Sequence, residues 1–205
     1  MKWQSRFAYG EELYLQKGIR LFASVLSAAI SGMEVCPVQV EADVSSGLPC
    51  FTMVGFPSTQ VKEAQDRVRT ALKNNGISLP PKKVTVNLAP ADLRKEGAGF
   101  DLPVAAAVLA ASGFIEPQLL RNVMVVGELS LNGEVRSVSG VLPRVIRARE
   151  LGCRYCIIPF ENLAEGALVK DMKVVGVQNI KEVLKRQGHG MMGMNLCLWM
   201  ETFRK

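Results

Sequence analysis

One helix of this chain is apolar on every side, and it limits the folds that the chain can adopt. Residues 102–112 are nearly all apolar, and residues 104–111 consist only of alanine, valine and leucine. A helix without a polar face has to be buried, and its alanines permit close packing. Asp101 is expected to be its N-cap, and Pro103 is tolerated within its first turn. At 205 residues the chain can build a substantial core around this helix.

A charged loop leads into the buried helix. Residues 87–103 run from a β-prone segment, residues 84–88, through a glycine-bearing loop to the start of the helix. Such a loop between two buried elements is where catalysis or recognition usually takes place. Asp92 and Glu96 lie beside cations, which favours ion pairing or turn capping over acid/base chemistry. The residues that we single out in this motif loop are Asn87, Pro90, Asp92, Arg94, Lys95, Glu96, Gly97, Asp101 and Pro103.

The first part of the chain is typical of strands. Residues 21–33 predict a buried first strand and a turn. Residues 38–44 alternate apolar and polar side chains, as a half-buried strand should. Residues 50–56 predict a second strand, and the turn at 45–47 joins the two as a hairpin.

A surface helix is expected next, beginning at the N-cap Ser58 and ending at Gly76. Its polar side carries charges four residues apart, at Lys62 and Asp66 and in a second such pair, Glu63 with Arg67, which predicts ion pairs. Its buried side is an apolar stripe at helical spacing, made of Val61, Ala64, Val68, Ala71 and Leu72.

The second half predicts short strands and one further helix. Residues 123–131 lead into Asn132-Gly133, a two-residue hairpin turn. Pro143 at N1 begins a helix over residues 144–151, which Gly152 ends. Its solvent face is basic, with Arg144, Arg147 and Arg149. The remaining elements are strands at 82–88, 135–138, 155–159 and 174–177 and a helical turn at 180–184. Together they predict an α+β fold, a mixed β-sheet with hairpins packed against two to three helices, rather than a doubly wound parallel sheet.

The charge of the chain permits an anionic partner. The formal net charge is +6 and the pI is near 9.2, but many basic proteins bind no nucleic acid. A scattered solvated charge is the alternative, and the sequence leaves it open. The residues that we expect to contact DNA, if any do, are Arg67, Arg69, Lys73, Lys82, Lys83, Arg144 and Arg147.

Cysteine usage indicates a reducing, cytoplasmic environment, because five scattered cysteines do not suggest a disulfide framework. Cys153 and Cys156 have the C-x-x-C spacing of redox and zinc sites. No second C-x-x-C exists, and the only histidine, His189, lies in an atypical tail. We therefore expect two small core or surface residues beside a strand, and no metal or cofactor. The apolar run at 21–33 is far shorter than the roughly 20 residues of a membrane span, so no membrane partner is expected.

The sequence lacks the motifs that are typical of several enzyme classes. The sequence has no G-x-x-x-x-G-K-[ST] phosphate-binding loop, and Gly97-Ala-Gly99 lacks the third glycine of a dinucleotide-binding fingerprint. A Ser-His-Asp triad would need a histidine within the patterned region.

Over residues 22–185 the chain resembles the N-terminal domain of Mg chelatase-like AAA+ ATPases of the ComM/YifB type. The resemblance is carried by long matches in order, above all Val-Thr-Val-Asn-Leu-Ala-Pro-Ala-Asp-Leu-Arg-Lys-Glu-Gly at 84–97 and Gly-Glu-Leu-Ser-Leu-Asn-Gly at 127–133. The other matching segments are residues 27–33, 38–49, 53–57, 61–64, 67–69, 100–103 and 140–143.

The resemblance implies a fold like the proteolytic domain of Lon, which is also found beside the ATPase core of the RadA recombination protein. Lon-type peptidases use a serine at the start of the buried helix and a lysine base further on. By the family pattern these would fall near Asp101 and Leu142, and no lysine lies between Lys95 and Lys170. The arginines present cannot serve as the base. A non-catalytic domain is therefore expected, with a peptidase of altered mechanism as the alternative.

We expect a poorly constrained leader at 1–20, the Lon-like domain at 21–187 and an atypical tail at 188–205. The family's ATPase core would be absent, as in a truncated form, and ATP and Mg²⁺ are expected only for full-length relatives. The resemblance links such proteins to DNA processing in natural transformation. This domain would contribute oligomerisation, DNA contact or both, so self-association and single- or double-stranded DNA are the expected partners. A metal-insertion role would need a metal-ligand cluster, which the sequence lacks.

Overall fold

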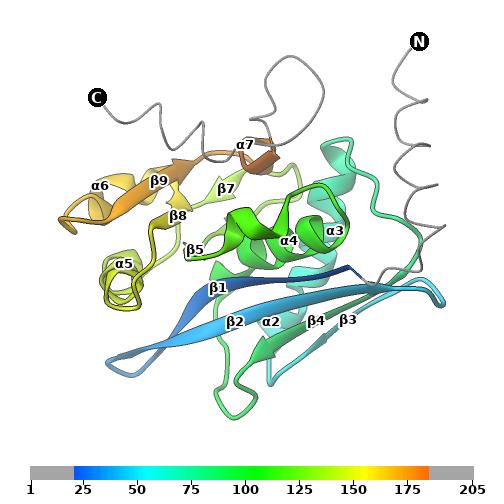
Figure 1. Ribbon diagram of the computed structural model, residues 1–205, viewed down its shortest axis with the longest axis horizontal. Coiled ribbons are helices and arrows are strands. Elements are labelled where there is room, and N and C mark those ends of the chain that lie inside the picture. The colour runs from blue at the N-terminus through cyan, green and yellow to red at the C-terminus, as the bar shows by residue number, and fades with distance from the viewer. Residues whose placement is uncertain (1–20, 185–205) are drawn as a thin grey trace.

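The computed structural model describes residues 21–184 (Figure 1). The predicted leader, residues 1–20, and the predicted tail, residues 188–205, lie outside the described residues. A seven-stranded sheet has the order β3-β4-β2-β1-β5-β8-β9, and β6 and β7 form a separate pair. The strands are β1 (Leu21–Ser31), β2 (Glu34–Ser45), β3 (Cys50–Val54), β4 (Lys83–Ala89), β5 (Val123–Val125), β6 (Glu128–Leu129), β7 (Val135–Arg136), β8 (Tyr155–Pro159) and β9 (Lys173–Val177).

The sheet is mixed, so the predicted α+β class is confirmed. β2 runs antiparallel to both β1 and β4, whereas the remaining neighbours in the large sheet are parallel. Within the described range, three helices contain 10 or 11 residues: α3, α4 and α5. The helices are α2 (Thr59–Lys62), α3 (Ala64–Asn74), α4 (Asp101–Ala111), α5 (Val141–Glu150), α6 (Leu163–Gly166) and α7 (Ile180–Leu184), with short 3₁₀ turns η1 (Ala98–Phe100), η2 (Pro117–Leu120) and η3 (Phe160–Asn162). Within residues 21–184 no helix has the length and apolar character needed to cross a membrane.

The predicted hairpin between the second and third strands is wrong. β2 and β3 do not pair, because β4 lies between them: Thr85 of β4 is opposite Asp43 of β2 on one side and Thr52 of β3 on the other. The turn after β2 does reverse the chain, but α3 then carries it back so that β4 enters the gap parallel to β3. Such a helical crossover is the usual connection between parallel strands. β1 and β2 form a hairpin instead, which confirms the predicted first strand and turn.

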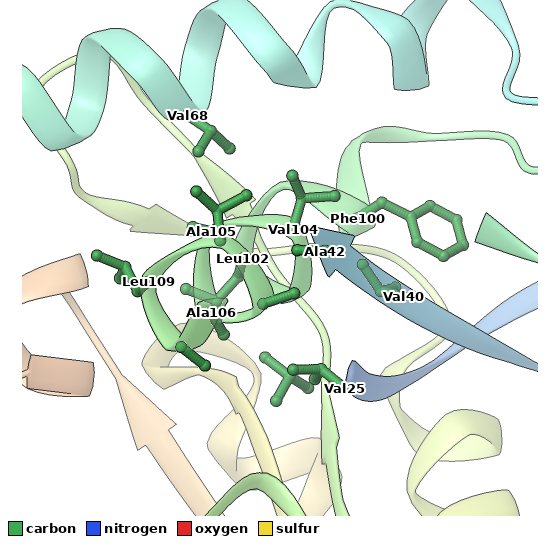
Figure 2. Close-up of a cluster of buried hydrophobic side chains, with 14 of the residues drawn as sticks. Val25, Val40, Ala42, Val68, Phe100, Leu102, Val104, Ala105, Ala106 and Leu109 are labelled. Carbon is green, nitrogen blue, oxygen red and sulfur yellow. The ribbon is translucent and has the colours of Figure 1, made fainter. Parts of the chain in front are cut away.

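The apolar helix occupies the position that its sequence predicts. Every residue of α4 is buried. Figure 2 shows the helix with Val68 of α3 on one side and with Val25, Val40 and Ala42 of the sheet strands on the other. The buried stripe predicted for the preceding surface helix is confirmed as well, since all five of its residues are buried. The α4 helix therefore lies between the sheet and α3.

A second apolar cluster lies against α5. Alternate residues of β1 divide between the two clusters, with Val25 and Ala29 in the cluster around α4 and Ala28 in the cluster with Val145 of α5. Because successive side chains of a strand point to opposite faces, α4 and α5 cover opposite faces of the sheet at β1.

The start of α2 and the end of α3 follow the predicted capping residues, whereas the starts of α4 and α5 do not. The amide of Val61 donates to Ser58 Oγ at 3.4 Å, and Gly76 has a φ of 77° after the end of α3. At α5, Pro143 was expected at N1. Helix α5 instead begins two residues earlier, because the amide of Leu142 donates to Glu165 Oε1 at 2.7 Å. A side chain distant in sequence satisfies this amide, and no local pattern could show that.

The predicted strand over 123–131 is interrupted, and its hairpin turn has a different length. β5 ends at Val125 and β6 begins at Glu128. The turn with Asn132 and Gly133 does join antiparallel strands, but Ser130 N donates to Glu134 O at 3.0 Å. The loop thus has one residue more than the predicted two, and Gly133 takes a φ of 87° as the last of them.

Candidate functional site

The motif loop is fastened to the turn that follows β3. Lys95 is fully buried, and its Nζ donates to Gly55 O at 2.8 Å and to Pro90 O. Its backbone pairs with the same turn, because Lys95 N donates to Phe56 O at 3.3 Å and Ser58 N donates to Lys95 O at 2.9 Å. From the sequence, this lysine is one of several charged residues in a loop. In the fold it is an internal clamp between two loops.

The lysine has no carboxylate within ion-pair distance among the described residues. Burial lowers the pKa of Lys95 from its ordinary 10.5, and the charge of Asp92 acts in the opposite direction. An ammonium that donates only to carbonyl oxygens is held by geometry rather than by a countercharge. Since the side chain is closed to solvent, it has no access to a substrate.

The outer part of the motif loop contains the expected ion pairing. Arg94 Nε lies 3.1 Å from Glu96 Oε1, and both side chains are exposed. Asp92 is exposed too. Asn87, at the end of β4, donates from Nδ2 to Glu41 Oε2 at 2.8 Å on the neighbouring strand. Exposed pairs of this kind contribute about 0 to 1 kcal/mol each, so they shape the turn without fixing the fold.

Asp101 is not the N-cap that the sequence predicts. It is the first residue of α4 itself, fully buried, with Phe100 in the cap position. Its carboxylate faces α3, where Arg67 donates from Nε to Oδ2 at 2.7 Å and from Nη2 to Oδ1 at 2.9 Å. The amide of Leu129 also donates to Oδ2, at 3.1 Å. A tertiary partner has displaced the local one, because a bidentate guanidinium is a stronger ligand than the first amides of a helix.

The electrostatics of this pair follow from burial. Desolvation raises the pKa of Asp101, while the hydrogen bonds from Arg67 and Leu129 N lower it. The hydrogen bond with Asp101 in turn raises the pKa of Arg67. Arg67 extends further, to Gln60 O at 2.9 Å and to Glu63 Oε2 at 3.4 Å. The pair therefore joins α3, α4 and the start of the β6–β7 hairpin, and both carboxylate oxygens are occupied by internal donors.

The predicted DNA-contacting residues divide into free and engaged cations. Arg69, Lys73 and Lys83 are exposed and Lys82 is half-buried. Among the residues that the structure describes, no carboxylate forms an ion pair with any of the four. Arg67 is engaged with Asp101.

Three arginines of α5 were predicted to lie on a solvent face, and Arg149 is exposed. Arg147 is half-buried and pairs with Glu150 through an N–O distance of 3.0 Å. For Arg144 the prediction is wrong, because its side chain is buried and donates to three backbone oxygens: Ala28 O at 3.0 Å, Ser139 O at 2.6 Å and Gly140 O at 3.2 Å. Burial lowers the pKa of Arg144. The side chain fastens β1 to the turn before α5 and is unavailable to a nucleic acid.

A second basic cluster was missed from the sequence. Arg154 Cζ lies 5.9 Å from the ring centre of Tyr155, and Lys173 Nζ lies 5.4 Å from it. The pairing of β8 with β9 places Lys173 beside Tyr155. The adjacent Arg-Tyr was a local signal, but the third residue is distant in the chain and only strand register brings it near.

The C-x-x-C pair occupies the positions expected of small packing residues. Cys156 is a buried residue of β8, and Cys153 precedes the strand and packs against the same apolar cluster. Burial raises the pKa of Cys156 to about 12. Within the described part of the chain no group of three metal-ligating side chains was found. The two thiols therefore belong to the core beneath α5.

Comparison with known proteins gives a consistent match. Residues 40–162 match the family model described as subunit ChlI of Mg-chelatase. Over 163 residues the chain is 44% identical to the competence protein ComM of Haemophilus influenzae, covering 80% of this chain and 32% of that protein. It is 47% identical over 147 residues to YifB of Salmonella typhimurium, covering 72% and 29%. A more distant relative is the DNA repair protein RadA of Listeria monocytogenes, 30% identical over 186 residues and covering 85% and 38%. The chain thus spans about a third of the length of these relatives.

Proposed function

Because the chain belongs to the Mg-chelatase ChlI family and to its ComM and YifB type, we propose that it is a non-catalytic, DNA-contacting module of Lon-like fold that acts in the cytoplasm. The printed names of two relatives, a competence protein and a DNA repair protein, support a role in DNA processing. ATP and Mg²⁺ are assigned to the longer relatives.

The buried Asp101 supports the absence of peptidase chemistry. It stands at the start of α4, where the family pattern would have a nucleophile, and both of its oxygens accept hydrogen bonds from internal donors. Lys95, the nearest lysine in sequence, is closed to solvent and bound to two carbonyl oxygens. A peptidase of altered mechanism is the alternative, and it would need a nucleophile and a base elsewhere.

One observation carries the DNA-contact proposal. Arg69 and Lys73 are exposed, four residues apart on α3, and neither has an ion-pair partner among the residues described. Residues at this spacing are neighbours on one side of a helix. Two adjacent unpaired cations are suited to phosphate oxygens, which contribute affinity independent of sequence. Lys83 at the start of β4 is a third exposed cation of the predicted set.

Fluorescence polarisation with labelled single- and double-stranded DNA tests the proposal. We expect binding at low salt and a decline with rising salt, because phosphate contacts release counterions. Replacing Arg69 and Lys73 with alanine should lower the slope of log affinity against log salt on duplex DNA by about 2. Alanine at Arg154 and Lys173 removes the same charge from a different surface and serves as the matched control.

The results distinguish DNA contact by α3 from attraction by net charge and from peptidase activity. An absence of binding at low salt refutes direct DNA contact. Equal losses in the two double variants would mean that net charge, rather than the α3 surface, attracts the DNA. Cleavage of an unstructured protein substrate by the purified chain, abolished by a single substitution, would favour the peptidase alternative.

A further inference from the structure

The two edges of the large sheet are protected differently. At one edge, Lys173 begins β9, and just beyond that strand Val135 N donates to Gln178 O at 2.8 Å, so the β6–β7 pair meets this edge. β3 forms the other edge, with β4 as its one strand partner among the described residues. An edge strand directs part of its backbone N–H and C=O groups away from the sheet, where another strand can bind them.

The β3 edge lacks the charged residues that commonly prevent such pairing. No charged residue occurs between Asp43 and Lys62, although 21% of the chain is charged. Lysines and inward-pointing charges are the common means by which edges avoid a second chain. Because the segment is neutral, two copies can bring it together without the repulsion that a net charge of +6 imposes elsewhere.

The exposed apolar side chains around β3 are placed symmetrically about Thr52. Val54 is 44% exposed, and beyond the ends of the strand Leu48 is 88% and Phe56 is 57% exposed. In an antiparallel pair of two identical strands centred on Thr52, residue numbers opposite each other sum to the same value. Cys50 then meets Val54 of the other copy, and Leu48 and Phe56 flank the pair just beyond the strand ends. A two-fold interface has to be self-complementary in this way.

The turn that presents Phe56 is rigid. Phe56 has a φ of 56°, in the left-handed region, and Gly55 has no room for a side chain, because an added Cβ would lie 2.3 Å from Leu88 O. The buried Lys95 holds the carbonyl of Gly55 from below at 2.8 Å. These contacts thus fix the backbone from which the exposed Phe56 side chain projects. A backbone fixed before binding loses less conformational freedom when a partner covers it.

We propose that the free edge of β3 pairs antiparallel with β3 of a second copy of this chain, centred on Thr52, so that one sheet continues through a two-fold dimer. Leu48 and Phe56 of opposite copies close the two ends of the interface. The pairing gives the expected self-association a defined surface and is independent of DNA contact by α3.

Disulfide trapping tests the register. Directly opposite residues of an antiparallel pair have Cα atoms about 4.5–5.5 Å apart, within the range that a disulfide spans. Thr52→Cys, made together with Cys50→Ser to remove the neighbouring thiol, should therefore form a covalent dimer under mild oxidation. Thr85→Cys in the same background is the matched control, because Thr85 lies beside Thr52 on the inner strand β4. We expect no dimer from this control or from Cys50→Ser alone.

Sedimentation velocity tests the association itself. Thr52→Lys places two like charges directly opposite each other across the two-fold axis, which destabilises a strand pair. We expect the dimer dissociation constant to rise about tenfold or more, whereas Thr85→Lys should leave it nearly unchanged. A native protein that is monomeric at every concentration overturns the proposal. The protein would be monomeric, for example, if another segment of the chain covered β3. A dimer that persists in Thr52→Lys, or one that Thr52→Cys fails to trap, also overturns it by placing the interface elsewhere. DNA binding by a monomer would leave the proposed function intact.

Discussion

Arg67 and Asp101 form a two-pronged ion pair across the α3–α4 contact, with N–O distances of 2.7 and 2.9 Å. The carboxylate is fully buried and the guanidinium is mostly so. Removing one member of a buried pair leaves the other charge without compensation. We expect Arg67→Met to lower the free energy of unfolding by about 3 kcal/mol, measured by urea denaturation.

The control for this experiment lies on the same arginine. Glu63 pairs with Arg67 at 3.4 Å but is well exposed, so Glu63→Gln should change the stability by about 0.5 kcal/mol or less. The double variant Arg67→Met with Asp101→Leu should be more stable than Arg67→Met alone, because it removes the stranded carboxylate. Equal losses for Arg67→Met and Glu63→Gln would contradict the structural role of Asp101.

The turn after β3 offers a test of close packing. Gly55 and Gly152 both have left-handed φ angles, 93° and 74°, but only at Gly55 would a Cβ meet backbone atoms within 4 Å. Gly152→Ala should lower the free energy of unfolding by about 1–2 kcal/mol through the left-handed conformation alone. Gly55→Ala adds overpacking against Leu88, so its loss should reach about 3 kcal/mol. Thermal and urea unfolding of the two variants measure the difference, and similar losses would mean that β4 readily moves away.

We expect Lys95 to make a contribution to stability that depends on pH. Burial lowers its pKa below 10.5, so between the folded-state pKa and 10.5 the unfolded chain carries more protons than the folded protein. Stability contributed by this group therefore rises with pH through that window and is lost as the pH falls through the folded-state pKa. We expect the stability difference between the native protein and Lys95→Met to increase as the pH approaches 10.5. A difference that shrinks over the same range would show that the ammonium is favoured by folding.

For Cys156 we expect the opposite dependence, a stability that falls as the pH rises. Burial raises its pKa from 9.0 to about 12, so in that window the unfolded thiol loses its proton while the folded one keeps it. The contribution of Cys156 is complete below 9.0 and declines as the pH rises toward 12. The stability of the native protein relative to Cys156→Ala should fall accordingly. Thiol labelling followed by mass spectrometry should modify Cys156 only after denaturation, and labelling at the rate of the half-buried Cys36 and Cys50 would contradict its burial.

Much of the fold follows from local patterns in the sequence. The all-apolar run of α4 requires burial, the stripe of α3 gives its orientation, and Gly76 and Gly152 end their helices as left-handed residues. These features depend on a few neighbouring residues. The pairing of strands does not, because the insertion of β4 between β2 and β3 depends on the crossover through α3.

The site residues were harder to place for the same reason. Lys95, Asp101 and Arg144 all carry charges that composition assigns to solvent or to a local cap, yet all three are buried. Their partners are a turn carbonyl at Gly55, a guanidinium at Arg67 and backbone oxygens of other segments. Only the assembled structure brings these groups together. Within the motif loop, Lys95 and Asp101 consequently make internal contacts, whereas Asp92, Arg94 and Glu96 are exposed.

The placement of β1 has a consequence for how the molecule comes apart. Its alternate side chains enter two separate apolar clusters, one with α4 and one with α5. If β1 separates from one apolar cluster, it has to separate from the other cluster as well. The region from β1 to β9 should therefore melt in a single cooperative transition, with calorimetric and van't Hoff enthalpies in agreement.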